Sequence, residues 1–188
     1  WYASPADRAA QDAANAAAAA QADRTLAEAW QSRRAYPLVV TQGDGNLGVK
    51  GKNFEMLFSI AGAGPASLKV NGTEWLWHAP RPAFWRASTD NDRGCGFPLR
   101  AAAWMAADVF VTYNGMKVLE AGPDCVKVQF QFGIPTVPGA SAELVYTVEA
   151  QDALRVDAVY HGVAGAPELP CFGVQFETFG PVTRTVWT

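Results

Sequence analysis

The stretch at residues 85–96 reads WRASTDNDRGCG and brings two carboxylates, an amide, two arginines and a thiol together. Asp90 and Asp92 match the D-x-D pattern that opens a calcium-binding loop. Such a loop also needs a ligand at its fifth position, glycine at its sixth and an acid at its twelfth. Those positions hold Gly94, Cys95 and Ala101. The spacing therefore excludes an EF-hand-type calcium site, and we predict no metal ligand here.

Thiol and hydroxyl nucleophiles have little support in this sequence. No G-x-S-x-G motif is present, which removes the usual hydrolase elbow. The three cysteines are widely spaced, which fits neither a zinc site nor a disulfide framework. Arg93 would favour the thiolate of Cys95, whereas Cys125 and Cys171 are expected as small buried hydrophobes at the ends of strands.

Acid–base chemistry is equally poorly supported. Glycoside hydrolysis requires two carboxylates held about 5–10 Å apart. The glutamates of the alternating segments all fall on the polar face; they are Glu55, Glu143, Glu149 and Glu177. His78 and His161 are expected in turns or at a rim rather than as general bases. We therefore predict that this chain contains no catalytic residue.

The segment GDGNLG, residues 43–48, matches the glycine spacing of a dinucleotide-binding turn. That function requires the glycines to open a helix, whose amides bind the pyrophosphate. The residues that follow, VKGKNFEMLF, have the pattern of a strand instead. We therefore predict a glycine-rich hairpin turn.

Aromatic residues bracket the polar stretch; they are Trp75, Trp77, Phe84, Trp85 and Phe97. Rings flanked by carboxylates and amides are typical of sugar-binding surfaces, because a pyranose stacks on the ring while its hydroxyls bond to the polar groups. Core packing competes for the same rings, and we expect one of them to be exposed. Trp85 and Phe97 are the candidates for sugar stacking.

Strands must position these groups, because apolar and polar residues alternate from Tyr36 onward. The predicted inward sets are Phe54, Met56, Phe58 and Ile60; Val126, Val128, Phe130 and Phe132; Leu144, Tyr146 and Val148; Leu154, Val156, Ala158 and Tyr160; and Phe172, Val174 and Phe176. Turn residues separate these segments at roughly 8–14 residue intervals, which indicates an antiparallel sandwich or barrel. The segment AAAWMAADVF, residues 101–110, is expected to hold one short helical turn.

Residues 1–35 differ in composition from the β-domain predicted over residues 36–188. They are rich in alanine, with Ser4 as a suitable N-cap and Pro5 at the first helical position, so we predict a helical linker or insertion.

The net charge of −3 and the scattered basic residues argue against a nucleic-acid partner. No run of about 18 apolar residues occurs, so no membrane span is expected. Sparse cysteines favour a cytoplasmic location.

The segment FWRASTDNDRG, residues 84–94, resembles the signature Phe-x-Arg-Ala-Pro-x-Asp-Asn-Asp-x-Gly of the C-terminal β-sandwich domain in β-galactosidases of glycoside hydrolase family 2. In some members this domain is the small chain. FEMLFSIAGAGPASLKVNGTEWL is similar to the family's entry into the domain, and AAAWMAADVF falls where the family has a Trp-containing segment. The resemblance covers about residues 36–188. Ser88 departs from it, because the family has proline there.

The resemblance implies the first half of an antiparallel supersandwich of the galactose mutarotase type. It implies a non-catalytic segment that supports and borders the active site of an enzyme hydrolysing terminal β-galactosides with retention. The catalytic glutamates and a Mg ion would lie in a barrel outside this chain, on the remaining domains or a large subunit, so no cofactor is expected here. A substrate-mouth function transfers to Asp90, Asn91, Asp92, Arg93 and Gly94.

Two alternatives stay open at this point. A carbohydrate-binding or scaffold module would bind galactosides by itself. An aldose-mutarotase-like enzyme on the same fold would use His78 or His161 together with Glu177.

Overall fold

The computed structural model describes residues 35–179 together with residues 13, 17, 21 and 24. Tyr36–Gly180 is one of the two units into which the chain divides. The four described positions near the N-terminus have helical backbone, and the rest of the predicted Ala-rich helix lies outside the described residues. Among the residues that the structure describes, no helix is long and apolar enough to cross a membrane.

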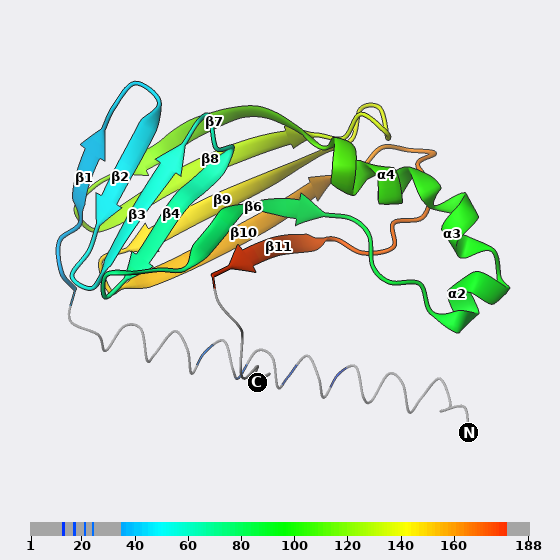
Figure 1. Ribbon diagram of the computed structural model, residues 1–188, viewed down its shortest axis with the longest axis horizontal. Helices are drawn as coiled ribbons and strands as arrows, with labels where there is room; N and C mark the ends of the chain where they lie inside the picture. Colours follow the sequence, from blue (N-terminus) through cyan, green and yellow to red (C-terminus); the bar gives the residue numbers. More distant parts are fainter. Residues whose placement is uncertain (1–12, 14–16, 18–20, 22–23, 25–34, 180–188) are drawn as a thin grey trace. The chain divides into compact units, whose positions relative to one another are not determined.

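The strands form antiparallel sheets (Figure 1). A five-stranded sheet has the order β1-β2-β3-β4-β5, a four-stranded sheet has the order β10-β9-β8-β7, and β11 pairs with β6. The bounds are β1 Val39–Gln42, β2 Asn46–Lys50, β3 Phe54–Ser59, β4 Gly64–Val70, β5 Thr73–Glu74, β6 Leu76–Ala83, β7 Thr112–Ala121, β8 Cys125–Gly133, β9 Ser141–Glu149, β10 Ala153–His161 and β11 Gly173–Thr178. The prediction of an all-β antiparallel sandwich is confirmed.

The core lies between the five-stranded and four-stranded sheets, because the apolar residues of both alternate inward. The β8–β9 register sets Val128 opposite Tyr146 and Phe130 opposite Leu144. Phe58 of β3 meets Phe130 and Tyr146 across the interface, with ring centroids 6.2 and 5.7 Å apart. Burying a side chain of this size contributes about 1.5–3 kcal/mol. These aromatic contacts therefore stabilise the stacking of the two sheets.

The glycine-rich segment 43–48 forms the predicted hairpin turn. The backbone N–H of Gly43 donates to the carbonyl of Asn46 at 2.9 Å, and β2 begins at Asn46. No helix follows the glycines, so the amides needed for a pyrophosphate are not presented.

Strand β11 departs from the alternation predicted for it. Its register with β6 shifts on either side of Glu177. Phe176 is therefore 50% exposed, and its predicted inward position is wrong, because a bulge changes the face that a side chain meets. Ile60 is also exposed, since β3 ends at Ser59 before reaching it. The other two predicted inward residues of the β11 segment pack against the core.

The helices between β6 and β7 lie at one end of the sheets (Figure 1); they are α2 Asp90–Gly94, α3 Phe97–Arg100 and α4 Ala102–Phe110. α4 has nine residues, longer than the single turn predicted, because its alanines favour helix. Trp104 is fully buried and its indole N–H donates to the Pro167 carbonyl at 3.0 Å. Asp108 Oδ1 accepts from the backbone N–H of Phe84 at 2.6 Å. These contacts fix both ends of the segment that carries α2.

Candidate functional site

The signature segment folds into α2, whose first turn is closed by a capping box. Thr89 is the N-cap: its Oγ1 accepts from the backbone N–H of Asp92 at 3.2 Å. In return, Asp92 Oδ2 accepts from the backbone N–H of Thr89 at 2.8 Å. Each bond satisfies an amide that the start of a helix leaves without a partner. The polar stretch is thus a well-capped turn, which continues as a short helix.

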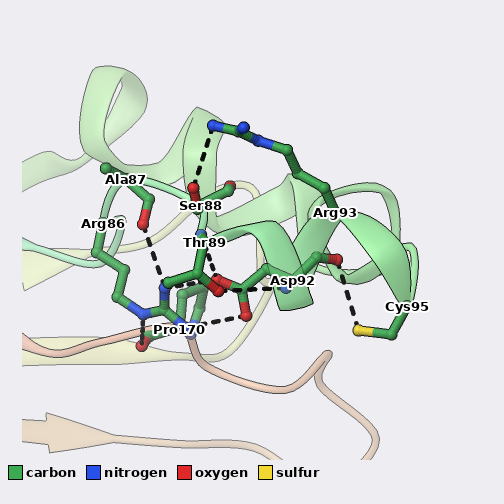
Figure 2. A network of polar contacts seen from close by, with 8 residues as sticks. All are labelled: Arg86, Ala87, Ser88, Thr89, Asp92, Arg93, Cys95 and Pro170. Carbon is green, nitrogen blue, oxygen red and sulfur yellow. Dashed lines mark hydrogen bonds and ion pairs between the residues drawn. The ribbon is translucent and has the colours of Figure 1, made fainter.

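Arg86 anchors this helix through Asp92 (Figure 2). Its guanidinium donates to both carboxylate oxygens, from Nη1 to Oδ2 at 2.6 Å and from Nη2 to Oδ1 at 3.2 Å. Its Nε also donates to the Pro170 carbonyl at 3.3 Å. Such a forked pair has a fixed geometry. Arg86 therefore ties α2 to the segment that leads into β11.

The hydrogen-bonded pair shifts the pKa of both its members. The hydrogen bond from Arg86, followed by the backbone hydrogen bond from Thr89, holds the pKa of Asp92 well below its usual range. The same bond raises the pKa of Arg86. Asp92 is therefore ionised at neutral pH and bonded to Arg86. A general acid must carry a proton that it can donate, so Asp92 does not suit that function.

The other predicted mouth residues lie on the exposed side of α2; they are Asp90, Asn91, Arg93 and Gly94. The Asp90 side chain is 98% exposed, and its Oδ1 accepts from Arg93 Nη1 at 3.2 Å. Arg93 Nη2 also donates to the Ser88 carbonyl at 3.2 Å (Figure 2). The structure thus brings all the predicted mouth residues onto one helix, with Asp92 as its anchor.

The backbone position that requires glycine is Gly96, which the sequence did not single out. Gly96 has φ of +69°, in the left-handed region that favours glycine, and it is the N-cap of α3. Gly94 has ordinary helical backbone as the last residue of α2. The left-handed backbone at Gly96 therefore lets the chain turn from α2 into α3.

The exposure of the aromatic rings around the polar stretch differs from the prediction. Phe97 is 8% exposed and belongs to the core, so it offers no free face for a sugar, and the burial corrects that assignment. Trp85 is half-buried against the core and keeps part of its surface exposed. Two rings of the bracketing set, rather than the expected one, are exposed: Trp75 at 52% and Trp77 at 57%.

Both histidines pair with a glutamate of another strand; the sequence had named Glu177 as a partner for a histidine but had not revealed Glu143. His78 Nδ1 lies 2.8 Å from Glu177 Oε2, and His161 Nε2 lies 3.3 Å from Glu143 Oε1. His78 lies within β6 rather than in a turn. The β6–β11 register sets it opposite Glu177, and both line an open hollow of about 350 Å³. Partners so far apart in the chain have no local signal.

The thiols are poorly suited to nucleophilic attack. Burial raises the pKa of both Cys125 and Cys171, which disfavours the reactive thiolate. Cys95 is exposed, and its Sγ donates to the Asp92 carbonyl at 3.5 Å. The geometry around α2 therefore suits polar contact on a fixed backbone rather than attack by sulfur.

Comparison with known proteins assigns this sandwich to a family. Residues 50–188 match the family model described as the β-galactosidase small chain. The chain belongs to the β-galactosidase small-chain family. It is 40% identical to the β-galactosidase small subunit of Latilactobacillus sakei over 169 residues, which cover 80% of this chain and 53% of that protein. The resemblance drawn from the signature segment is confirmed.

Longer β-galactosidases are also similar to this chain. It is 34% identical to the β-galactosidase of Clostridium acetobutylicum, with 79% of this chain and 16% of that protein covered. It is 36% identical to the β-galactosidase of Streptococcus thermophilus, with 74% of this chain and 14% of that protein covered. This small-chain family member therefore spans about half of the L. sakei subunit and about a sixth of the longer relatives.

Proposed function

We propose that this chain is a non-catalytic β-sandwich segment of a β-galactosidase that hydrolyses terminal β-galactosides. Its family and the names of its relatives support this function. The carboxylate that α2 holds most firmly, Asp92, is committed to Arg86. We therefore place the retaining chemistry of two carboxylates in a catalytic barrel outside this chain. The partner is the remaining part of the enzyme or its large subunit.

Within that assembly, α2 borders the mouth of the substrate site. The observation that carries this proposal is the Arg86–Asp92 pair, which fixes the helix while Asp90, Asn91 and Arg93 stay exposed. Groups held in place before binding lose little entropy when a ligand arrives, and their amide, carboxylate and guanidinium groups match sugar hydroxyls. The exposed part of Trp85 would stack on the sugar.

The same proposal concerns the position of the metal ion and the cellular location of the chain. A Mg ion, implied by the family resemblance, would be held by the barrel. Among residues 35–179, no three His, Cys, Asp or Glu side chains gather to hold a metal, and we therefore propose that the Mg ligands belong to the barrel. All three cysteines are free, which supports the cytoplasm as the proposed location.

The test is hydrolysis of a chromogenic β-galactoside by three samples: this chain, the barrel-carrying polypeptide, and their mixture. We expect full activity only in the mixture. Activity of this chain alone would contradict its non-catalytic function. An inactive mixture, with galactoside binding by this chain alone, would favour a carbohydrate-binding module.

The His78–Glu177 pair favours a second candidate, an aldose-mutarotase-like activity. A histidine held 2.8 Å from a carboxylate beside an open hollow is a suitable arrangement for moving a proton. This function predicts that the chain accelerates anomer interconversion of galactose, measured by polarimetry, and that His78→Ala abolishes the acceleration. His161→Ala is the matched control, because His161 pairs with Glu143 instead. No acceleration by the wild-type chain would remove this candidate.

A further inference from the structure

Helix α4 is apolar around its whole circumference. Its inner face carries the buried Trp104 and Ala107. At about 100° per residue, the opposite arc consists of Ala102, Met105, Ala106, Val109 and Phe110. Its only charged residue, Asp108, bonds to the backbone of Phe84. A helix at the surface normally turns a polar face to water, and one that is apolar all round is buried.

The outer face of α4 is nevertheless open in this chain. Its large side chains are 54% exposed at Met105, 73% at Val109 and 60% at Phe110. Leu99 of α3, three residues before α4 begins, is a further large apolar side chain and is 85% exposed. We call Leu99, Met105, Val109 and Phe110 the α4 surface. Uncovered apolar groups of this size on one short segment are typical of an interaction site.

A hollow beside the α4 surface offers room for an inserted side chain. Its volume is about 230 Å³, and its lining includes Val109, Val111, Tyr113 and Phe132.

We propose that the α4 surface docks onto the catalytic chain of the β-galactosidase, an inference that rests on the proposed function. The surface lies on the same helical segment as α2 (Figure 1), and Leu99 follows the mouth residues closely in sequence. A partner that covers α4 would therefore have α2 at the edge of its interface. The longer relatives show how much protein is available to cover it, since this chain matches only 16% of the C. acetobutylicum enzyme.

Other segments of the same chain suit this surface less well. The Ala-rich residues 1–35 contain few large apolar side chains to fill it. The catalytic chain is therefore the occupant that we assign.

A matched pair of substitutions tests the docking. Val109→Lys places a charge on the α4 surface, and Val39→Lys makes the same change at a 60% exposed valine of β1. Each purified chain is titrated with the separately produced barrel-carrying polypeptide of the same enzyme, and the dissociation constant is measured by analytical ultracentrifugation. We expect Val109→Lys to weaken association at least about tenfold, the effect of a central interface residue. Val39→Lys should leave the constant unchanged.

Hydrogen exchange on the wild-type complex gives a second readout that needs no variant. The α4 amides should exchange more slowly in the complex than in the free chain.

Equal dissociation constants for the two variants, or unchanged α4 exchange, would overturn the docking. Activity of the mixture would in that case still uphold the proposed function. No association of the wild-type chain would overturn both. Self-association that Val109→Lys abolishes, without any effect on binding the catalytic chain, would assign the surface to a second copy instead.

Discussion

At the scale of single residues, Asp92 determines how firmly α2 is held. Its carboxylate accepts bonds from Arg86 and from the Thr89 amide, whereas the exposed carboxylate of Asp90 on the same helix accepts a bond from Arg93. We expect Asp92→Asn to speed amide exchange across residues 86–96 a few-fold, because the charge-assisted bonds are the strong ones. Asp90→Asn is the matched control and should change little. Equal effects of the two substitutions would contradict the anchoring function of Asp92.

The same residue predicts a dependence of stability on pH. Because the folded state holds the pKa of Asp92 below its ordinary value of about 3.9, folding favours the ionised carboxylate. Its contribution is fully present above the unfolded pKa and is lost as pH falls through the folded pKa. Between pH 5 and pH 2, roughly the window that spans the unfolded value, wild-type stability should therefore fall more steeply than that of Asp92→Asn. Parallel curves of urea unfolding against pH would exclude this effect.

Tyr146 gives a second prediction for a single residue. Its ring is buried between the sheets, its hydroxyl has no hydrogen-bond partner among the described residues, and burial holds its pKa well above the usual range. Tyr146→Phe removes a polar group that gains nothing from burial. We expect the free energy of unfolding to stay the same or to rise by up to about 1 kcal/mol. A clear loss in urea denaturation would show that the hydroxyl has a partner in solution.

At the scale of elements, α4 has two faces with separable functions. Trp104 is fully buried and bonded to Pro167, whereas the adjacent Met105 is 54% exposed. Trp104→Ala should lower the free energy of unfolding of this chain by about 3–5 kcal/mol. Met105→Ala should change it by no more than about 0.5 kcal/mol and should weaken only association with the catalytic chain. Urea denaturation and ultracentrifugation of both variants measure the two effects; a large stability loss in Met105→Ala would contradict this division.

The elements also show which features the sequence could predict. Alternation located β8 and β9 correctly, because Val126 to Phe132 keep one register from end to end. It failed at Phe176, because a bulge depends on the partner strand β6 and leaves no mark in the segment itself. The signature residues of α2 were found from their local pattern. The burial of Phe97 and the pairing of His161 with Glu143 were not, since both depend on contacts made by distant parts of the chain.

At the scale of the whole molecule, the sandwich buries a core between its two main sheets and yet leaves the α4 surface open. A chain of this kind gains stability when its partner binds, because the partner binds only the folded form. At a partner concentration of about 100 times the dissociation constant the gain is about 2.7 kcal/mol, which for a domain of this size raises the melting temperature by roughly 5–10 °C. Differential scanning fluorimetry, with the partner's own transition subtracted, measures this shift. At the same concentration Val109→Lys, with a dissociation constant about tenfold higher, should show only about half of this shift, because the gain falls to about 1.4 kcal/mol. Val39→Lys should show all of it. If both variants gained the full shift, the partner would stabilise the sandwich through another surface, and the apolar face of α4 would need a different explanation.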